Sequence, residues 1–112
     1  MDDEEIIGLF FERSEQAIQE LDTKYGKTCH SLSYRILNDR QDAEECVNDA
    51  YFGAWNAIPP AHPDPLLAYI VKIVRNLSLK LYWKKEAAKR NSIFTVAMQE
   101  IDDCIADPKT VE

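Results

Sequence analysis

The chain has 112 residues, enough for a single domain that buries roughly two thirds of the surface its unfolded chain exposes. Its three cysteines are an odd number at wide spacings, which argues against a disulfide framework or a zinc ribbon and favours a reducing cytoplasm. The net charge of −7 argues against nucleic-acid binding, yet residues 72–90 hold seven basic side chains against one acidic, whereas residues 1–58 hold thirteen acidic against five basic.

The chain contains only three glycines, which leaves little material for the turns of an all-β domain, and its segments are typical of helices. A short apolar stretch over residues 6–11 precedes a longer predicted helix over residues 12–37, which Gly26 could bend or break. The apolar residues that recur at helical spacing in this longer segment are Ala17, Ile18, Leu21, Tyr25, Cys29, Leu32, Ile36 and Leu37.

The next predicted helix follows the turn at Asn38 and Asp39, whose side chains can cap it, and ends at about residue 58 before Pro59. Glu44 and Glu45 are expected in its first turn, where the helix dipole favours negative charge. Its inner stripe of small apolar residues consists of Ala43, Cys46, Val47, Ala50, Ala54 and Ile58.

The opposite face of that helix has a different character, because it combines carboxylates and amides with one aromatic side chain. This face could dock a basic partner helix with Phe52 as the anchor, but periodicity alone favours a solvated polar face with one stray aromatic. The residues of this face are Glu45, Asn48, Asp49, Phe52 and Asn56.

Four of the five prolines fall within residues 59–65, so this loop is stiff and suited to shape recognition. His62 in the loop could stack on a base or have no role at all. The helix that follows is predicted over residues 66–90. Its core stripe consists of Leu67, Ile70, Ile73, Val74, Leu77 and Leu81.

A second face of this helix interleaves positive charge with aromatic surface, the chemistry that single-stranded nucleic acid requires. It comprises Lys72, Arg75, Asn76, Leu79, Tyr82 and Trp83, with Lys80, Lys84 and Lys85 beside them. Residues 91–112 predict a short acidic helical extension and then a linker near Asp107; the extension could instead fold back and compete for the basic face.

Catalytic and metal sites find no support in the sequence. There is no nucleophile elbow and no phosphate-cradling glycine loop, and the carboxylates are spread over solvated faces, so we expect neither an enzyme nor a cofactor. Cys29 and Cys46 fall on apolar stripes, so we expect buried small residues rather than metal ligands. The acidic N-terminus is unlike a signal peptide, and we expect a soluble protein without membrane contact.

Two stretches carry a resemblance to a known family. Residues 42–55 (DAEECVNDAYFGAW) are similar to DAEDLVQEVFLRLW, and residues 66–77 (LLAYIVKIVRNL) are similar to FRAWLYRIARNLA. Both stretches occur in region 2 of the sigma-70 superfamily, especially in its extracytoplasmic-function members, and they arrive here in the same order and spacing. The likeness extends over residues 5 to 90.

The resemblance implies a compact all-α bundle of three to four main helices with short loops, with room for an additional C-terminal helix. Residues 1–90 would form the region 2 domain and residues 91–112 an extension or linker. A second domain that reads the minus-thirty-five element is absent, so we expect a fragment of a longer cytoplasmic bacterial protein.

The resemblance also implies partners, namely the clamp helices of the RNA polymerase β′ subunit and the non-template strand of the melted minus-ten promoter element; an anti-sigma protein is a further candidate. The residues it assigns to β′ are Glu45, Asn48, Asp49, Phe52 and Trp55. Those it assigns to DNA, taken together with the basic face, are Pro60, Ala61, His62, Asp64, Lys72, Arg75, Asn76, Leu79, Lys80, Tyr82 and Trp83.

Departures from the family pattern and alternatives qualify this assignment. The loop lacks the tryptophan or tyrosine that wedges a duplex open in primary sigma factors, so we expect a poor melter that needs a near-ideal promoter. A helical protein-interaction module without DNA recognition is the alternative function. An RNA-binding module is less favoured, because none of the RNA-binding signatures is present.

Overall fold

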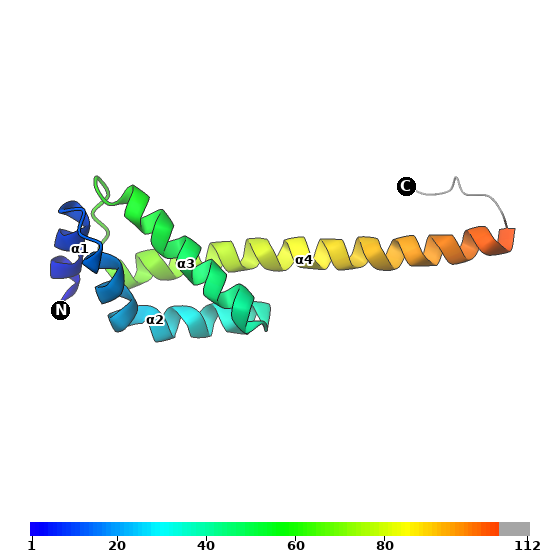
Figure 1. Cartoon of the computed structure of the whole chain (residues 1–112), viewed down its shortest axis with the longest axis horizontal. Coiled ribbons are helices and arrows are strands. Elements are labelled where there is room, and N and C mark those ends of the chain that lie inside the picture. Colours follow the sequence, from blue (N-terminus) through cyan, green and yellow to red (C-terminus); the bar gives the residue numbers. More distant parts are fainter. Residues whose placement is uncertain (106–112) are drawn as a thin grey trace. The chain divides into compact units, whose positions relative to one another are not determined.

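The computed structural model describes the backbone of residues 1–105 and the side chains of residues 1–90. Within the described part the chain forms four α-helices and no strand, which confirms the predicted all-α fold (Figure 1). The helices are α1 (Asp3–Phe11), α2 (Gln16–Leu37), α3 (Arg40–Ala57) and α4 (Leu66–Ile105).

The chain divides into two units, Met1–Leu81 and Tyr82–Glu112, and α4 supplies residues to both. Residues 91–105 therefore continue α4 rather than forming a separate helix. The linker predicted near Asp107 lies outside the described residues.

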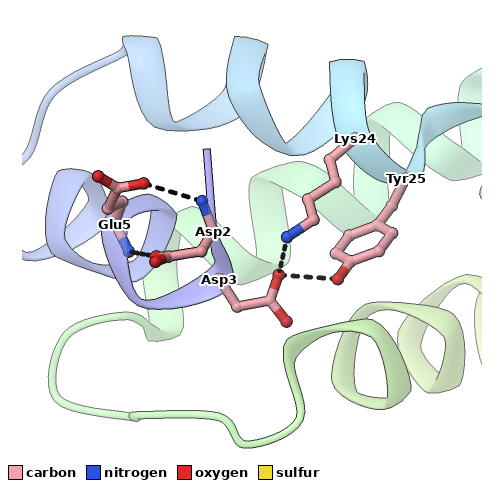
Figure 2. A network of polar contacts seen from close by, with 5 residues as sticks. All are labelled: Asp2, Asp3, Glu5, Lys24 and Tyr25. Atoms are coloured by element: carbon pink, nitrogen blue, oxygen red, sulfur yellow. Dashed lines mark hydrogen bonds and ion pairs between the residues drawn. The ribbon is translucent and has the colours of Figure 1, made fainter.

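The acidic N-terminus builds the start of α1. The Asp2 carboxylate accepts a hydrogen bond from the Glu5 amide at 2.8 Å, and the Glu5 carboxylate accepts one from the Asp2 amide at 2.9 Å, which forms a capping box (Figure 2). Asp3 then accepts from Lys24 Nζ at 2.8 Å and from the Tyr25 hydroxyl at 2.7 Å (Figure 2). These acids therefore stabilise α1 and hold it against α2.

A tight turn separates α1 from α2, so the single helix expected over residues 12–37 is wrong at its start. The Ser14 amide donates to the Leu9 carbonyl at 2.9 Å and the Arg13 amide to the Phe10 carbonyl at 3.0 Å, the pattern of a Schellman motif. Arg13 occupies the left-handed position with φ of 57°, where glycine is usual. The sequence offered no glycine or proline to mark this helix end.

The turn between α2 and α3 follows the sequence prediction. Asn38 is left-handed (φ 54°) at the end of α2, and the Asp39 carboxylate caps α3 by accepting from the Asp42 amide at 2.9 Å. Because α3 begins at Arg40, its first turn contains Asp42, and the expectation that Glu44 and Glu45 lie in that turn is wrong.

The core of the first unit gathers apolar residues from all four helices. The predicted inner stripe of α3 is buried throughout, because its alanines allow the neighbouring helices to approach closely. The α4 stripe is shifted by one residue at its start: Leu66 is buried and Leu67 is exposed, since Leu66 is the residue in register with Ile70 and Val74.

Two buried polar features complete the packing. The hydroxyls of Ser33 and Ser78 are both fully buried and lie 2.7 Å apart, linking α2 to α4. Gly26 does not break α2, which is continuous; it is buried, and a Cβ atom there would collide with the Asp22 carboxylate and approach the Tyr51 hydroxyl to 3.5 Å. Its small size therefore makes room for a side-chain contact between α2 and α3.

Candidate functional site

The outer face of α3 leaves its polar and aromatic side chains in solvent. Glu45, Asn48 and Asp49 are exposed, and the Phe52 side chain is 65% exposed. An aromatic ring this exposed gains little from the fold and is available to a partner. The structure thus brings together four of the five side chains assigned to polymerase binding on one open helical face.

Trp55, the fifth of these residues, is half-buried and held from two sides. Its ring lies 6.1 Å from the Phe10 ring, centroid to centroid, and the Arg13 guanidinium carbon stacks 3.9 Å from the Trp55 centroid. A cation over an indole face is a favourable geometry. Trp55 is therefore a fixed wall of the α3 face, whereas Phe52 is open.

The same guanidinium secures the end of α3. Arg13 Nη1 donates to the carbonyl of Trp55 at 2.7 Å and to that of Ile58 at 2.8 Å. These carbonyls belong to the last turn, where a helix has no internal donors left and where the dipole favours a cation. Arg13 consequently anchors the point at which the proline-rich loop leaves α3.

The loop is pinned at three places and open between them. Ile58 and Leu66 are buried at its ends, and Pro63 is buried in its middle. The Ala61 amide also donates to the Ala57 carbonyl at 3.0 Å. A loop held this way presents its other side chains in a fixed shape.

The loop residues assigned to DNA differ in their exposure to solvent. Pro60, His62 and Asp64 are exposed, and Ala61 is half-buried. The His62 ring lies 6.0 Å from the exposed Phe11 ring, and its Nε2 lies 3.4 Å from Glu4 Oε1, an ion pair when the imidazole is protonated. His62 is therefore near α1, a neighbour that the sequence did not predict.

The basic residues of α4 that belong to the first unit are accessible. Lys72, Arg75, Asn76 and Lys80 are exposed, and Leu79 is half-buried. Among the side chains of residues 1–90, no carboxylate forms an ion pair with Lys72, Arg75 or Lys80. Their charge is thus available to an external polyanion.

In the second unit, Tyr82 and Trp83 form an edge-to-face pair with ring centroids 5.2 Å apart. The Trp83 side chain is 61% exposed and Tyr82 is half-buried. An exposed indole supported by a neighbouring ring offers a flat surface on which a base can stack.

The cysteines are placed as the apolar stripes predict. Cys29 and Cys46 are buried and unpaired by disulfide, and burial raises the pKa of the Cys29 thiol to about 11. No group of three potential metal ligands occurs among the described residues. No described helix combines the length and apolar character that crossing a membrane requires.

The sequence of the chain was compared with models of known protein families. A family model described as Sigma-70 region 2 matches residues 21–88. The chain belongs to the sigma-70 region 2 family. No curated protein and no solved structure matches it.

Sigma-70 region 2 is a promoter-recognition unit, so the chain has a sigma-factor role in transcription initiation, with RNA polymerase core and promoter DNA as its partners. This family is not an enzyme class. All residues assigned to polymerase or DNA lie inside the matched segment.

Two residues that shape the site lie outside the region 2 match and were missed as functional residues. Arg13 anchors Trp55 and the loop, and Ile18 of α2 lies beside Phe52 in a hollow described below. Nothing in the sequence pointed to the role of Arg13, because the residues that it contacts are 42 and 45 positions away. Ile18 was noted only as part of an apolar stripe.

Proposed function

We propose that the first unit binds the β′ clamp helices of RNA polymerase through the outer face of α3. The observation that supports this most directly is the exposure of Phe52 among Glu45, Asn48 and Asp49. An apolar anchor within an acidic rim suits an amphipathic helix that carries lysine or arginine, since the acids set the register and speed the encounter.

The test is binding of the purified chain to an isolated β′ clamp-helix fragment. We expect Glu45→Ala with Asp49→Ala to slow association and make binding less sensitive to salt, and Phe52→Ala to raise the Kd by tenfold or more, about 1.4 kcal/mol. Because Phe52 is exposed, its removal should leave the unfolding free energy within about 0.5 kcal/mol of wild type.

The matched control changes the net charge by the same two units outside α2 and α3: Glu12→Lys, at an exposed residue that makes no side-chain hydrogen bond or ion pair in the described part of the chain. This control should keep the wild-type affinity. Equal loss in the control and in the Glu45 and Asp49 variant would mean that net charge alone governs binding. The polymerase contact would be refuted if the wild-type chain did not bind at tens of micromolar, a concentration that corresponds to a binding free energy of about 6 kcal/mol.

The second part of the proposal is capture of the open minus-ten element. The pinned loop with Pro60, His62 and Asp64 would hold an unstacked base, and Lys72 and Arg75 would follow the backbone of the non-template strand. Unstacking a base costs a few kcal/mol, and a preformed pocket with nearby cations offsets that cost only for the open form. Melting then becomes capture of a fluctuation, without ATP.

Binding to isolated duplex should be weak, because few phosphates are neutralised and the chain carries a net charge of −7. The informative assay is therefore binding of the chain with polymerase core to a promoter oligonucleotide whose minus-ten segment is unpaired. Lys72→Ala with Arg75→Ala should weaken DNA binding at least tenfold and leave clamp-helix binding unchanged. The control is Lys27→Ala with Arg35→Ala, two exposed cations of α2.

The alternative function, an acidic protein-interaction module, predicts a different pattern. Loss of Lys72 and Arg75 would then weaken protein binding along with any DNA binding, and paired and unpaired minus-ten segments would bind alike. Sigma factors act in the cytoplasm in general, and the proposal places this chain there.

A further inference from the structure

A hollow of about 220 Å³ opens between α2 and α3 beside the exposed Phe52 ring. Four of its lining residues are one α3 stripe at spacings of three and four, and the fifth comes from α2. The lining residues are Ile18, Asn48, Tyr51, Phe52 and Trp55. We call this hollow the Ile18 socket.

The size and lining of the Ile18 socket fit a single side chain. Pockets that bind whole small molecules occupy roughly 300–1,000 Å³, so this hollow is below that range. Its walls are one aliphatic and three aromatic side chains, and Asn48 supplies the only amide group among the lining residues. An aliphatic side chain would therefore replace water against apolar surface, with the amide at its edge.

Two of the aromatic walls are fixed before any partner arrives. The Trp55 ring lies against Phe10 and under the Arg13 guanidinium, and the buried Tyr51 ring is tied to α2 because its hydroxyl donates to Asp22 Oδ1 at 2.6 Å. A preformed hollow costs less ordering entropy on binding than one that must assemble. The socket is thus a built feature of the α2–α3 pair.

The charges around the socket restrict what can enter it. Glu45 and Asp49 are exposed on the same α3 face, so a second copy of this chain would bring like charges together at the rim. A helix with a lysine or arginine about one turn from an aliphatic side chain would satisfy both the rim and the hollow.

We propose that the Ile18 socket receives one leucine- or isoleucine-sized side chain of the partner helix, which makes Ile18 of α2 part of the polymerase-binding surface. This inference rests on the proposed binding of the β′ clamp helices and names the chemistry of its central contact. Phe52 then covers one side of the inserted side chain rather than serving as the sole anchor.

The experiment is a double-mutant cycle with the clamp-helix fragment. Ile18→Trp fills the socket and should raise the Kd about tenfold or more, and replacing one particular aliphatic residue of the fragment by alanine should do the same. The two changes together should raise the Kd no more than either change alone, because both remove the same contact. Val71→Trp is the control, since Val71 is also half-buried and aliphatic but lines a different hollow.

A second readout leaves the socket unchanged. The chain has two tryptophans, so Trp83→Phe leaves Trp55 as the only one, and a clamp-helix fragment without tryptophan should shift its emission to shorter wavelength on binding. Among fragments that each have one aliphatic residue replaced by alanine, added at saturating concentration, one should give a clearly smaller shift. This measurement decides the matter if Ile18→Trp does not fold.

The outcomes separate the socket from the proposed function. The socket is refuted if wild type binds and Glu45→Ala with Asp49→Ala weakens binding, yet no aliphatic residue of the fragment couples to Ile18 and none alters the Trp55 emission. If the wild-type chain does not bind the fragment at all, the proposed polymerase contact fails and the socket inference fails with it.

Discussion

Replacing Gly26 by alanine tests whether the hydrogen bond between Tyr51 of α3 and Asp22 of α2 stabilises the fold more than the higher helix propensity of alanine does. In an ordinary helix interior this change stabilises by about 1 kcal/mol. Here the new Cβ atom would collide with the Asp22 carboxylate, which accepts a hydrogen bond from the Tyr51 hydroxyl. If Asp22 rotates away, the Tyr51 hydroxyl loses its acceptor. Water cannot easily replace that acceptor, because Tyr51 is only 5% exposed.

The magnitudes decide the sign. A hydrogen bond to a charged group contributes about 1.5–3 kcal/mol, so its loss exceeds the propensity gain and Gly26→Ala should destabilise by about 0.5–2 kcal/mol. In a Tyr51→Phe background the acceptor is no longer needed, and the same substitution should stabilise by up to about 1 kcal/mol. The measurement is urea unfolding followed by far-UV circular dichroism.

Gly53→Ala is the matched control, because Gly53 is also helical and no atom lies within 4 Å of an added Cβ. It should stabilise by about 1 kcal/mol in both backgrounds. The reasoning is refuted if Gly26→Ala stabilises the wild-type chain as much as it stabilises the Tyr51→Phe variant, since the contact with Asp22 would then carry no net free energy.

Three further predictions follow from other contacts. Ser33→Ala should destabilise by about 1–3 kcal/mol because it leaves the buried Ser78 hydroxyl without its 2.7 Å partner, and the double alanine variant should cost less than the sum of the single changes in urea unfolding. The Lys24 ammonium lowers the pKa of Asp3, so Asp3→Asn should cost up to about 1 kcal/mol above pH ~4 and progressively less as acid protonates the carboxylate; an equal cost at all pH values would contradict this. Because burial raises the pKa of Cys29 to about 11, mass-spectrometric mapping should find it modified by iodoacetamide at pH ~8 far more slowly in the folded than in the urea-unfolded chain.

Local rules predicted the helix boundaries where the usual residues mark them. Asn38 and Asp39 indicate the α2–α3 turn because their side chains suit the left-handed and capping positions. The stripe of small apolar residues on α3 is buried because its helical spacing places all of them on one face. The open face with Phe52 was predictable for the same reason. It is what remains when the buried stripe is assigned.

Contacts between distant residues were out of reach. The sequence predicts a bend or a break at Gly26 because its own helix gives no other reason for a glycine, whereas α2 is unbroken there and the space that Gly26 leaves serves a contact with Tyr51, 25 positions later. The one-residue shift from Leu67 to Leu66 arises where the loop enters α4, and periodicity alone leaves the phase of a stripe uncertain by one residue at its end. Arg13 was not considered, because a left-handed helix end usually carries glycine.

The choice of arginine at that position links the two proposed surfaces. A left-handed backbone costs a residue other than glycine roughly 1–2 kcal/mol, and glycine would remove this cost. The Arg13 guanidinium instead donates to the Trp55 and Ile58 carbonyls and stacks on the Trp55 ring, and even partly solvated bonds from a charged donor, about 1.5 kcal/mol each, exceed the strain. One side chain therefore holds a wall of the Ile18 socket and the start of the proline-rich loop. The proposed polymerase surface and the loop proposed to capture a base therefore share a support, Arg13, that lies before the region 2 match.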